Sequence, residues 1–224
     1  MTFPFRDRRD AGRKLADALP ALDPENTVVV ALPRGGVSVA EEICRRFHLP
    51  LDLVFVRKIG MPHQPEVALG AVVDGDAPEV IVNPRILEYS GFTEDDIAEM
   101  GRQLLPEIER RKMLYLQGIR RPTLRAKTVV VVDDGVATGA TLRASLTALR
   151  RVKPKGIIVA LPTAPPETLP MMAELADEVI CLDRPRAFRA VGAAYASFPQ
   201  TQDAEVIAAL QRCAQWNNDR DADQ

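Results

Sequence analysis

Two adjacent carboxylates end an apolar run near the middle of the sequence. Asp133 and Asp134 directly follow the valines at positions 129–132. Two like charges side by side are poor ligands for an anion, but each carboxylate can accept a hydrogen bond from a sugar hydroxyl. Such a charge-assisted bond contributes ~1.5–3 kcal/mol, and a nearby Mg²⁺ would ease the repulsion between the two charges. We therefore expect the pair to bind the hydroxyls of a sugar.

Small and hydroxyl-bearing residues follow the aspartates. The segment reads GVATGAT, in which Gly135 and Gly139 permit the backbone conformations that bring amide groups close to a ligand. Amides at the start of the following helix, its dipole and the hydroxyls of Thr138 and Thr141 would suit a phosphate. A plain strand-to-helix turn with Thr141 as a cap is the alternative, but it would not need so many small residues. An acid pair beside a phosphate cradle indicates ribose 5-phosphate.

Two other segments carry potential anion ligands, and each follows a predicted strand. In PRGG (33–36), Gly35 and Gly36 can expose amides to an anion and Arg34 adds a positive charge, although taken alone the segment also fits an ordinary loop. Arg57 and Lys58 follow the next strand, where they either neutralise a bound anion or remain solvated surface charges.

Apolar runs alternate with helical patterns along the chain. Continuous β-branched runs such as TVVVAL are typical of strands buried on both faces. Pro106 predicts a kink or a break in a long charged helix that begins after Thr93. Strands are predicted at 27–32, 51–56, 68–73, 79–82, 127–132, 156–162 and 178–182, and helices at 37–47, 93–117, 140–152, 166–176 and about 203–214.

This alternation predicts an α/β fold, a doubly wound and mostly parallel sheet flanked by helices. Ligands of such sheets bind at the carboxyl ends of the strands, so the candidate segments should meet at one edge. We expect a single domain over 1–215, a turn at Asp74 and Gly75, and a disordered polar tail over 216–224.

Composition narrows the function classes. The chain has 224 residues, 46% of them hydrophobic, and a net charge of −2, which argues against nucleic acid and anionic membranes as partners. Its three cysteines are scattered without zinc-ligand spacing, and they fit a reduced compartment. No signal peptide is visible, and no apolar stretch approaches the ~18 residues of a membrane helix. We therefore expect a cytoplasmic protein.

The segment VVVVDDGVATGATL closely resembles the phosphoribosyl pyrophosphate signature of type I phosphoribosyltransferases. It has their order of apolar run, two acids, Gly, a small residue and then Thr-Gly-small-Thr. The rest of the chain looks like one bacterial subgroup of predicted phosphoribosyltransferases, from FRDRRDAGRKLADAL through ALPRGG, VRKIG and PEVALGAVV to AVGAAYASFPQTQDAEV. The resemblance implies the type I fold with a small hood subdomain, contributed by about 59–82 and 185–200, of which 59 to about 78 would be a flexible loop.

The resemblance also implies residue roles. Asp133 and Asp134 would bind the ribose 2- and 3-hydroxyls, and PRGG would be a pyrophosphate loop with a non-proline cis peptide near Arg34 and Gly35. The 5-phosphate ligands would be Gly135, Val136, Ala137, Thr138, Gly139, Ala140 and Thr141. The pyrophosphate ligands would be Arg34, Gly35, Gly36 and Lys58. The catalytic residues would be Arg34, Arg57, Lys58, Asp133 and Asp134.

The implied reaction is Mg²⁺-dependent transfer of the 5-phosphoribosyl group to a small nitrogenous acceptor, a nucleobase by preference, with release of pyrophosphate. Mg²⁺ would arrive with the pyrophosphate and lie near Asp133 and Asp134 without a dedicated protein ligand. The resemblance also makes a homodimer an expectation, since this fold often dimerises.

The segments expected to contact the acceptor depart from the subgroup. The hood loop reads GMPHQPE where relatives often have Gly-Ala-Pro-Gly-Asn-Pro-Glu, and His63 in it is either an acid or base or an exposed loop histidine. Phe188, Tyr195 and Phe198 could stack on a base or belong to the core, while Arg189 stands where relatives have an aromatic residue. A purine, a pyrimidine, another heterocycle and an amine all remain open as acceptors.

Two classes of rival function remain, a binding module and a hydrolase. A non-catalytic sensor of phosphoribosyl pyrophosphate or a nucleotide fits the same signature. A DNA-binding repressor lacks its additional helix-turn-helix domain here, whereas the arginines between 102 and 125 form either an RNA-binding patch or a solvated helix face. A phosphatase or hydrolase would need a nucleophile with a paired base, which the sequence does not offer.

Overall fold

A five-stranded parallel sheet forms the core of the protein. The computed structural model describes residues 4–74 and 78–222. The sheet has the order β2-β1-β6-β7-β8, with β1 (Thr27–Ala31), β2 (Leu51–Leu53), β6 (Thr128–Val132), β7 (Gly156–Thr163) and β8 (Glu178–Asp183). The described helices are α1 (Arg8–Ala18), α2 (Gly35–Phe47), α3 (Pro84–Ser90), α4 (Glu94–Arg102), α5 (Leu105–Leu116), α6 (Ala140–Arg151), α7 (Leu169–Leu175) and α8 (Asp203–Ala222), with short 3-10 helices η1 (Pro166–Thr168) and η2 (Val191–Ala194). This architecture is the predicted doubly wound sheet.

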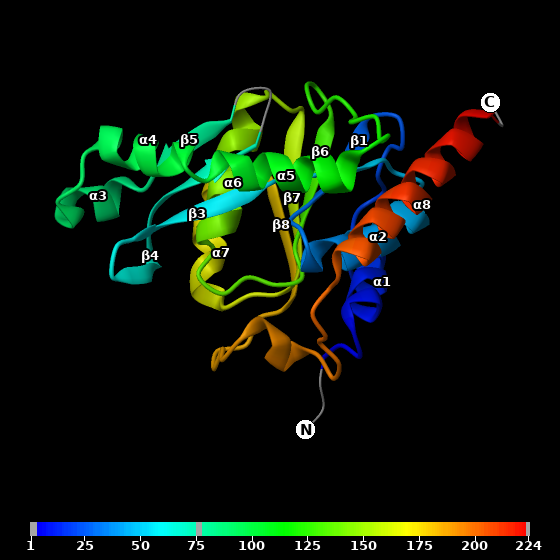
Figure 1. Cartoon of the computed structure of the whole chain (residues 1–224). Helices are drawn as coiled ribbons and strands as arrows, with labels where there is room; N and C mark the ends of the chain where they lie inside the picture. Colours follow the sequence, from blue (N-terminus) through cyan, green and yellow to red (C-terminus); the bar gives the residue numbers. More distant parts are fainter. Residues whose placement is uncertain (1–3, 75–77, 223–224) are drawn as a thin grey trace.

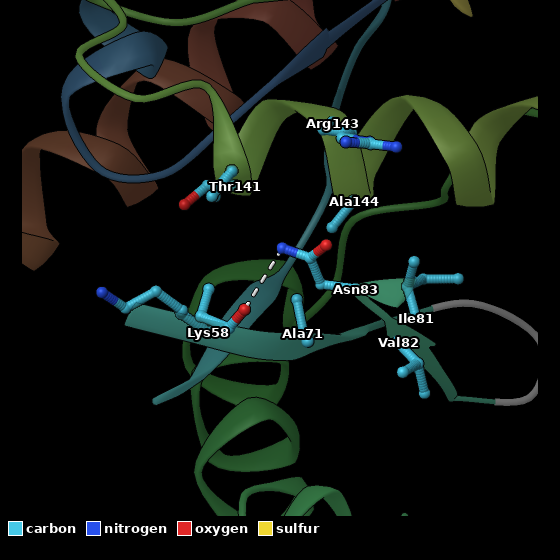
Figure 2. Close-up of a pocket in the computed structure, with 11 residues that line it drawn as sticks. Lys58, Ala71, Ile81, Val82, Asn83, Thr141, Arg143 and Ala144 are labelled. Atoms are coloured by element: carbon cyan, nitrogen blue, oxygen red, sulfur yellow. Dashed lines mark hydrogen bonds between the residues drawn. The ribbon is translucent and has the colours of Figure 1, made fainter. Parts of the chain in front are cut away.

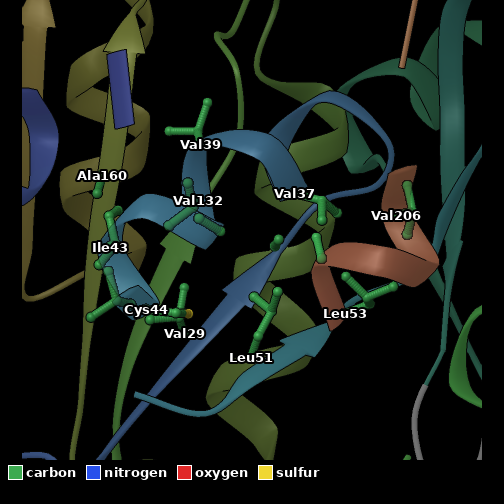
Figure 3. Close-up of a cluster of buried hydrophobic side chains, with 14 of the residues drawn as sticks. Val29, Val37, Val39, Ile43, Cys44, Leu51, Leu53, Val132, Ala160 and Val206 are labelled. Atoms are coloured by element: carbon green, nitrogen blue, oxygen red, sulfur yellow. The ribbon is translucent and has the colours of Figure 1, made fainter. Parts of the chain in front are cut away.

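Alternate side chains of the central strands enter two separate cores. Val29 packs in the cluster that contains α1, α2 and α8, whereas Val28 and Val30 pack against α6 and α7. Figure 1 shows α1, α2 and α8 together on one side of the sheet, and Figure 3 shows side chains of that cluster between the strands and the helices. Burial on both faces explains why these strands contain β-branched residues without polar alternation.

Parallel pairing brings the ends of the strands to one edge. Val29 and Val130 are register partners, so β1 and β6 end side by side at Ala31 and Val132. The segments that follow these strands therefore start next to each other, as the sequence predicts.

A second sheet forms the hood, and here the sequence-based prediction needs correction. The antiparallel sheet consists of β3 (Val56–Met61), β4 (Gln64–Val73) and β5 (Glu79–Val82). The predicted strands 68–73 and 79–82 are confirmed within β4 and β5, whereas β3 and the start of β4 replace the first part of the flexible loop predicted over 59–78. The predicted strand 51–56 stops at Leu53, so Arg57 and Lys58 lie within β3 and not at the end of a parallel strand. The predicted turn at Asp74 and Gly75 lies partly outside the described residues.

Apolar packing explains why the Gly- and Pro-rich hood segment forms strands. A side chain at Gly101 of α4 would touch Val80, Val72 and Ile59, so the helix lies directly on the sheet. The opposite side of the hood sheet contacts α6. Strand β3 lies in a segment that was predicted to be a loop, and packing against these two apolar surfaces stabilises it.

Several helices differ from their predicted bounds. The break predicted by Pro106 occurs at 103–104, which separates α4 from α5 and places the proline in the first turn of α5, where its missing amide costs nothing. Helices α1 and α3 were not predicted. Helix α8 extends to Ala222, so the predicted disordered tail is helical over 216–222, because neither Gly nor Pro follows residue 203 to end the helix. In the part of the chain that the structure describes, no helix combines the length and apolar character needed to cross a bilayer.

Candidate functional site

The loop after β1 and the aspartates after β6 are in direct contact. A side chain on Gly35 would collide with the Asp134 carboxylate, and one on Gly36 would lie 2.8 Å from the Val132 carbonyl oxygen. Only glycine permits this approach of the two loops. The peptide between Pro33 and Arg34 is cis, in agreement with the expectation for this loop. The structure thus brings together the two segments that the sequence singles out.

Asp134 is held by a residue that sequence reasoning missed. Nε of Arg8 donates to Asp134 Oδ2 at 2.7 Å, and the two side chains are only 11% and 15% exposed. Nη1 of Arg8 donates to the Pro199 carbonyl oxygen at 2.6 Å, and the guanidinium lies 3.7 Å from the Phe198 ring centroid. Arg8 therefore joins α1, the acid pair and the C-terminal segment.

The two aspartates have different environments. Asp133 Oδ1 accepts a hydrogen bond from the Asp134 amide at 2.9 Å, and among the described residues Asp133 has no ion-pair partner. Burial, together with the adjacent charge of Asp134, raises the pKa of Asp133 well above its usual range. The site therefore contains one carboxylate paired with an arginine and one carboxyl group that binds its proton more tightly than usual.

The loop from 135 to 139 leads into the uncapped start of α6. Gly139 has φ 76° and Gly135 has φ 152°, where a side chain would be strained. The N-cap Gly139 offers no side chain, so the first amides of α6 have no partner within the helix. Thr141 lies inside the helix, and the alternative in which it acts as a simple cap is wrong. Ala137, Thr138 and Thr141 are exposed and accessible to an anion.

Arg34 is oriented by two elements far away in the sequence. Its Nη1 lies 3.3 Å from Asp203 Oδ1 at the start of α8, and the Tyr115 hydroxyl of α5 donates to the same oxygen at 2.6 Å. Burial, followed by the hydrogen bond to Asp203, raises the pKa of Tyr115 to about 12. Tyr115 and Asp203 were not predicted, because only the folded chain brings them to the loop.

Arg57 and Lys58 line two different cavities, as neighbouring residues of one strand should. Arg57 faces a cavity that is also lined by Pro33, Arg111 and Thr141. Lys58 borders a cavity between the hood sheet and α6 that also reaches Thr141 (Figure 2). The two predicted cations thus approach the phosphate loop from the hood, although not from the strand position that was predicted.

Two residues considered for contact with the acceptor, His63 and Tyr195, lie in a turn and in the core. His63 is exposed in the tight turn between β3 and β4, with φ 66°. Tyr195 is buried, packs on Phe5 and Phe198 at centroid distances of 5.4 and 4.8 Å, and its hydroxyl donates to the Asp134 carbonyl oxygen. The core alternative therefore fits Tyr195, and the Phe198 ring is partly covered by Arg8.

The donor set fits a metal ion that is shared with a ligand. Within the described ranges, no group of three or more His, Cys, Asp or Glu residues could hold a metal. Asp133 and Asp134 offer two adjacent carboxyl groups, one of them already bound by Arg8. Mg²⁺ commonly binds one or two carboxylates together with phosphate oxygens of a substrate, and this chemistry suits such a pair.

Comparisons with known proteins agree with the site. The family model described as the phosphoribosyl transferase domain matches residues 8–196. Two Mycobacterium tuberculosis proteins, Rv0571c of strain H37Rv and MT0597 of strain CDC 1551, carry the provisional name phosphoribosyl transferase and are 40% identical to this chain over 208 residues. The match covers 93% of this chain but 46% of theirs, so the chain spans less than half the length of these relatives.

A solved structure is similar over almost its whole length. The crystal structure of TT1426 from Thermus thermophilus has 40% sequence identity and a TM-score of 0.81, and the match covers 94% of this chain and 99% of that one. Together with the family match and the site geometry, this similarity confirms the predicted fold. The chain belongs to the phosphoribosyl transferase domain family and has the type I phosphoribosyltransferase fold.

Proposed function

We propose that this protein is a Mg²⁺-dependent phosphoribosyltransferase that moves the 5-phosphoribosyl group of phosphoribosyl pyrophosphate to a nitrogenous acceptor. The observation that carries the proposal is the contact between Gly35 and the Asp134 carboxylate. It puts the candidate pyrophosphate loop beside the candidate ribose ligands, so that one donor molecule could contact both.

The phosphoribosyl half of the donor is assigned to β6 and α6. Asp133 and Asp134 accept from the ribose 2- and 3-hydroxyls. The backbone of 135–141 and the hydroxyls of Thr138 and Thr141 hold the 5-phosphate, because the uncapped start of α6 offers amides to an anion.

The pyrophosphate half is assigned to the PRGG loop and the hood. Arg34 and the amides of Gly35 and Gly36 bind pyrophosphate, and Arg57 and Lys58 add charge from β3. The bond from ribose C1 to the pyrophosphate oxygen breaks and its electron pair leaves with pyrophosphate. The acceptor nitrogen forms the new bond to C1 and gives up its proton to solvent. Magnesium held near Asp133 and Asp134 together with the pyrophosphate would add to the neutralisation of the leaving charge. The protein contributes positioning and fixed positive charge around the departing oxygen.

The acceptor is assigned to the side of the site next to Asp134 and η2. A nitrogen nucleophile would reach C1 from the side opposite the PRGG loop, and we favour a nucleobase because the family resemblance implies one. A screen of purine, pyrimidine and other nitrogen acceptors with phosphoribosyl pyrophosphate and Mg²⁺, following pyrophosphate release, identifies it. If no acceptor leads to pyrophosphate release, the enzymatic proposal is contradicted.

Substitution of both aspartates tests the donor site. Asp133→Asn with Asp134→Asn replaces both carboxyl groups that would accept from ribose and removes the charge of Asp134, so we expect binding of phosphoribosyl pyrophosphate to weaken about tenfold or more by calorimetry. Asp95→Asn, an exposed carboxylate on α4, is the matched control and should bind normally. Unchanged affinity of a folded double variant would refute the assignment, and Asp134→Asn alone serves if the double variant does not fold.

A sensor of the same donor is the second candidate. The ion pair of Arg8 with Asp134 favours it, because a carboxylate already engaged by an arginine has less capacity left for a reacting ribose. Tight binding of phosphoribosyl pyrophosphate without pyrophosphate release for any acceptor would support the sensor.

A further inference from the structure

Arg111 of α5 faces the candidate site in a cavity of positive charge. The cavity lies between the PRGG loop, the start of β3 and α5, and Thr141 of the phosphate loop forms part of its wall. Its charged lining residues, among those that the structure describes, are Arg57 and Arg111, with no carboxylate. The rest of the lining is apolar except for Thr141 and consists of Leu32, Pro33, Val54, Phe55, Val56 and Ile108. Two cations beside apolar walls favour an anion over a cation or a neutral group at this place.

The position of Arg111 is fixed by Glu107, one helical turn earlier. Nε of Arg111 donates to Glu107 Oε1 at 2.8 Å, and Nε of Arg110 donates to Glu107 Oε2 at 2.8 Å. The hydrogen bond from Arg110, followed by that from Arg111, lowers the pKa of Glu107 to about 2, so Glu107 is ionised at neutral pH. The arginine side chains differ in setting, since Arg111 is 31% exposed in the cavity wall and Arg110 is 59% exposed outside it.

Arg111 also lies in the electrostatic neighbourhood of Arg34. The hydrogen bond from Tyr115, and with it the charges of Arg34 and Arg111, lowers the pKa of Asp203. Both guanidinium groups therefore act on the same carboxylate, from the PRGG loop and from α5. Arg57 and Arg111 line the space between Pro33 and Thr141, and Arg34 belongs to the loop that borders this space.

We propose that Arg111 is a binding residue of the pyrophosphate subsite, which contacts the diphosphate group of the donor and of the product together with Arg57. The proposal rests on the proposed function, because it places pyrophosphate between the PRGG loop and Thr141. It gives α5, a helix outside the phosphoribosyl signature, a direct part in donor recognition.

The test compares Arg111→Gln with Arg110→Gln. Both substitutions remove one of the two arginines that bind Glu107, but only Arg111 lines the cavity. Calorimetric titrations use inorganic pyrophosphate with Mg²⁺, phosphoribosyl pyrophosphate with Mg²⁺, and ribose 5-phosphate. We expect Arg111→Gln to weaken both diphosphate ligands about tenfold or more and ribose 5-phosphate less than about twofold, while Arg110→Gln changes none of the three beyond twofold. Arg111→Lys, which keeps the charge, should recover part of the affinity.

Each other outcome has a definite meaning. Equal diphosphate affinity in Arg111→Gln and wild type overturns the role of Arg111 and leaves the proposed function intact. Equal losses for ribose 5-phosphate and the diphosphates overturn it as well, because they indicate a general disturbance of the site. A wild-type protein that binds neither diphosphate ligand refutes the proposed function itself. If Arg111→Gln melts at a clearly lower temperature, Arg111→Lys decides, since its charge is retained.

Discussion

At the scale of single residues, Arg8 has the largest consequence for the site. It is nearly buried and joins Asp134, the Pro199 carbonyl and the Phe198 ring. Breaking a buried ion pair from one side leaves an uncompensated charge. We expect Arg8→Gln to lower the free energy of unfolding by ~3–5 kcal/mol in urea denaturation and to weaken binding of phosphoribosyl pyrophosphate.

Arg6 provides the control for Arg8. It is 75% exposed and lies 3.6 Å from Asp10, so Arg6→Gln should change the free energy of unfolding by less than ~1 kcal/mol. If Arg8→Gln and Arg6→Gln lower the free energy of unfolding by similar amounts, the buried ion pair stabilises the protein no more than the exposed one.

Asp133 gives the stability of the protein a specific pH dependence. Its pKa is raised in the folded state, so the folded protein holds this proton while the unfolded chain, with a pKa of ~3.9, releases it. Stability from this group is complete below pH ~4 and is lost as the pH rises through the folded-state pKa. Asparagine mimics the protonated carboxyl at every pH. We therefore expect Asp133→Asn to gain stability relative to wild type as the pH rises from ~4 to ~8, measured by thermal unfolding.

Asp134→Asn is the companion of that experiment. It removes the ion pair with Arg8, so it should be less stable than wild type at neutral pH. If Asp133→Asn and Asp134→Asn both raise or both lower the stability at neutral pH, the two aspartates do not have the different charge states inferred here.

At the scale of elements, an ionic cluster fastens the hood sheet to the core sheet. Arg121 donates from Nε to Asp52 Oδ1 at 3.0 Å, from Nη1 to Asp74 Oδ2 at 2.9 Å, and from Nη2 to the Leu53 carbonyl oxygen at 3.0 Å. Asp52 lies in β2 and Asp74 directly after β4, and both carboxyl groups are buried. Burial raises the pKa of Asp52 in spite of Arg121, which shows how costly the charge would be without its partner.

We expect Arg121→Ala to destabilise the protein by ~3–5 kcal/mol and to increase hydrogen exchange in β4 relative to β6. Two buried carboxylates lose a shared cation, and the hood is held less firmly. Arg120→Ala is the matched control, because Arg120 is exposed and forms no ion pair among the described residues. Uniform exchange changes in both sheets would contradict a local role in holding the hood.

The central elements and the hood strands at 68–73 and 79–82 could be predicted from the sequence, whereas the first hood strand could not. Runs such as Val129–Val132 admit only a strand buried on both faces, and β1, β6 and β7 lie where they were expected. β3 and the start of β4 contain Gly60 and a proline, and these suggest a loop until α4 and α6 cover both faces of the sheet. The polar composition of the C-terminal residues suggested a disordered tail from residue 216, but no Gly or Pro ends helix α8 there.

The candidate site was predictable in its centre and not at its edges. Asp134 and Gly35 follow neighbouring parallel strands, so their meeting follows from topology alone. Arg8 lies 126 residues from Asp134, and no local pattern connects them. Asp203 reaches Arg34 only because α8 starts beside the PRGG loop.

At the scale of the whole molecule, the site draws on segments that are widely separated in the chain. The phosphate loop comes from the middle, the cations from the hood, and the supports of Asp134 from α1 and from residues 195–199. Such long-range contacts cost loop-closure entropy and form late in folding. A single substitution in any of these regions can therefore disturb the same small volume.

The candidate site around Asp134 is complete only after Phe5 has paired with Tyr195. The Phe5 amide donates to the Ala194 carbonyl at 3.1 Å, and the Ala196 amide donates to the Phe5 carbonyl at 2.9 Å. On a ribosome, the parallel strands could pair while residues 195–199 are still inside the exit tunnel. Asp134 would then be present without the tyrosine and the carbonyl that hold it and Arg8 in place. Synthesis of the chain therefore imposes a delay of 61 residues between making Asp134 and making the tyrosine that fixes its geometry.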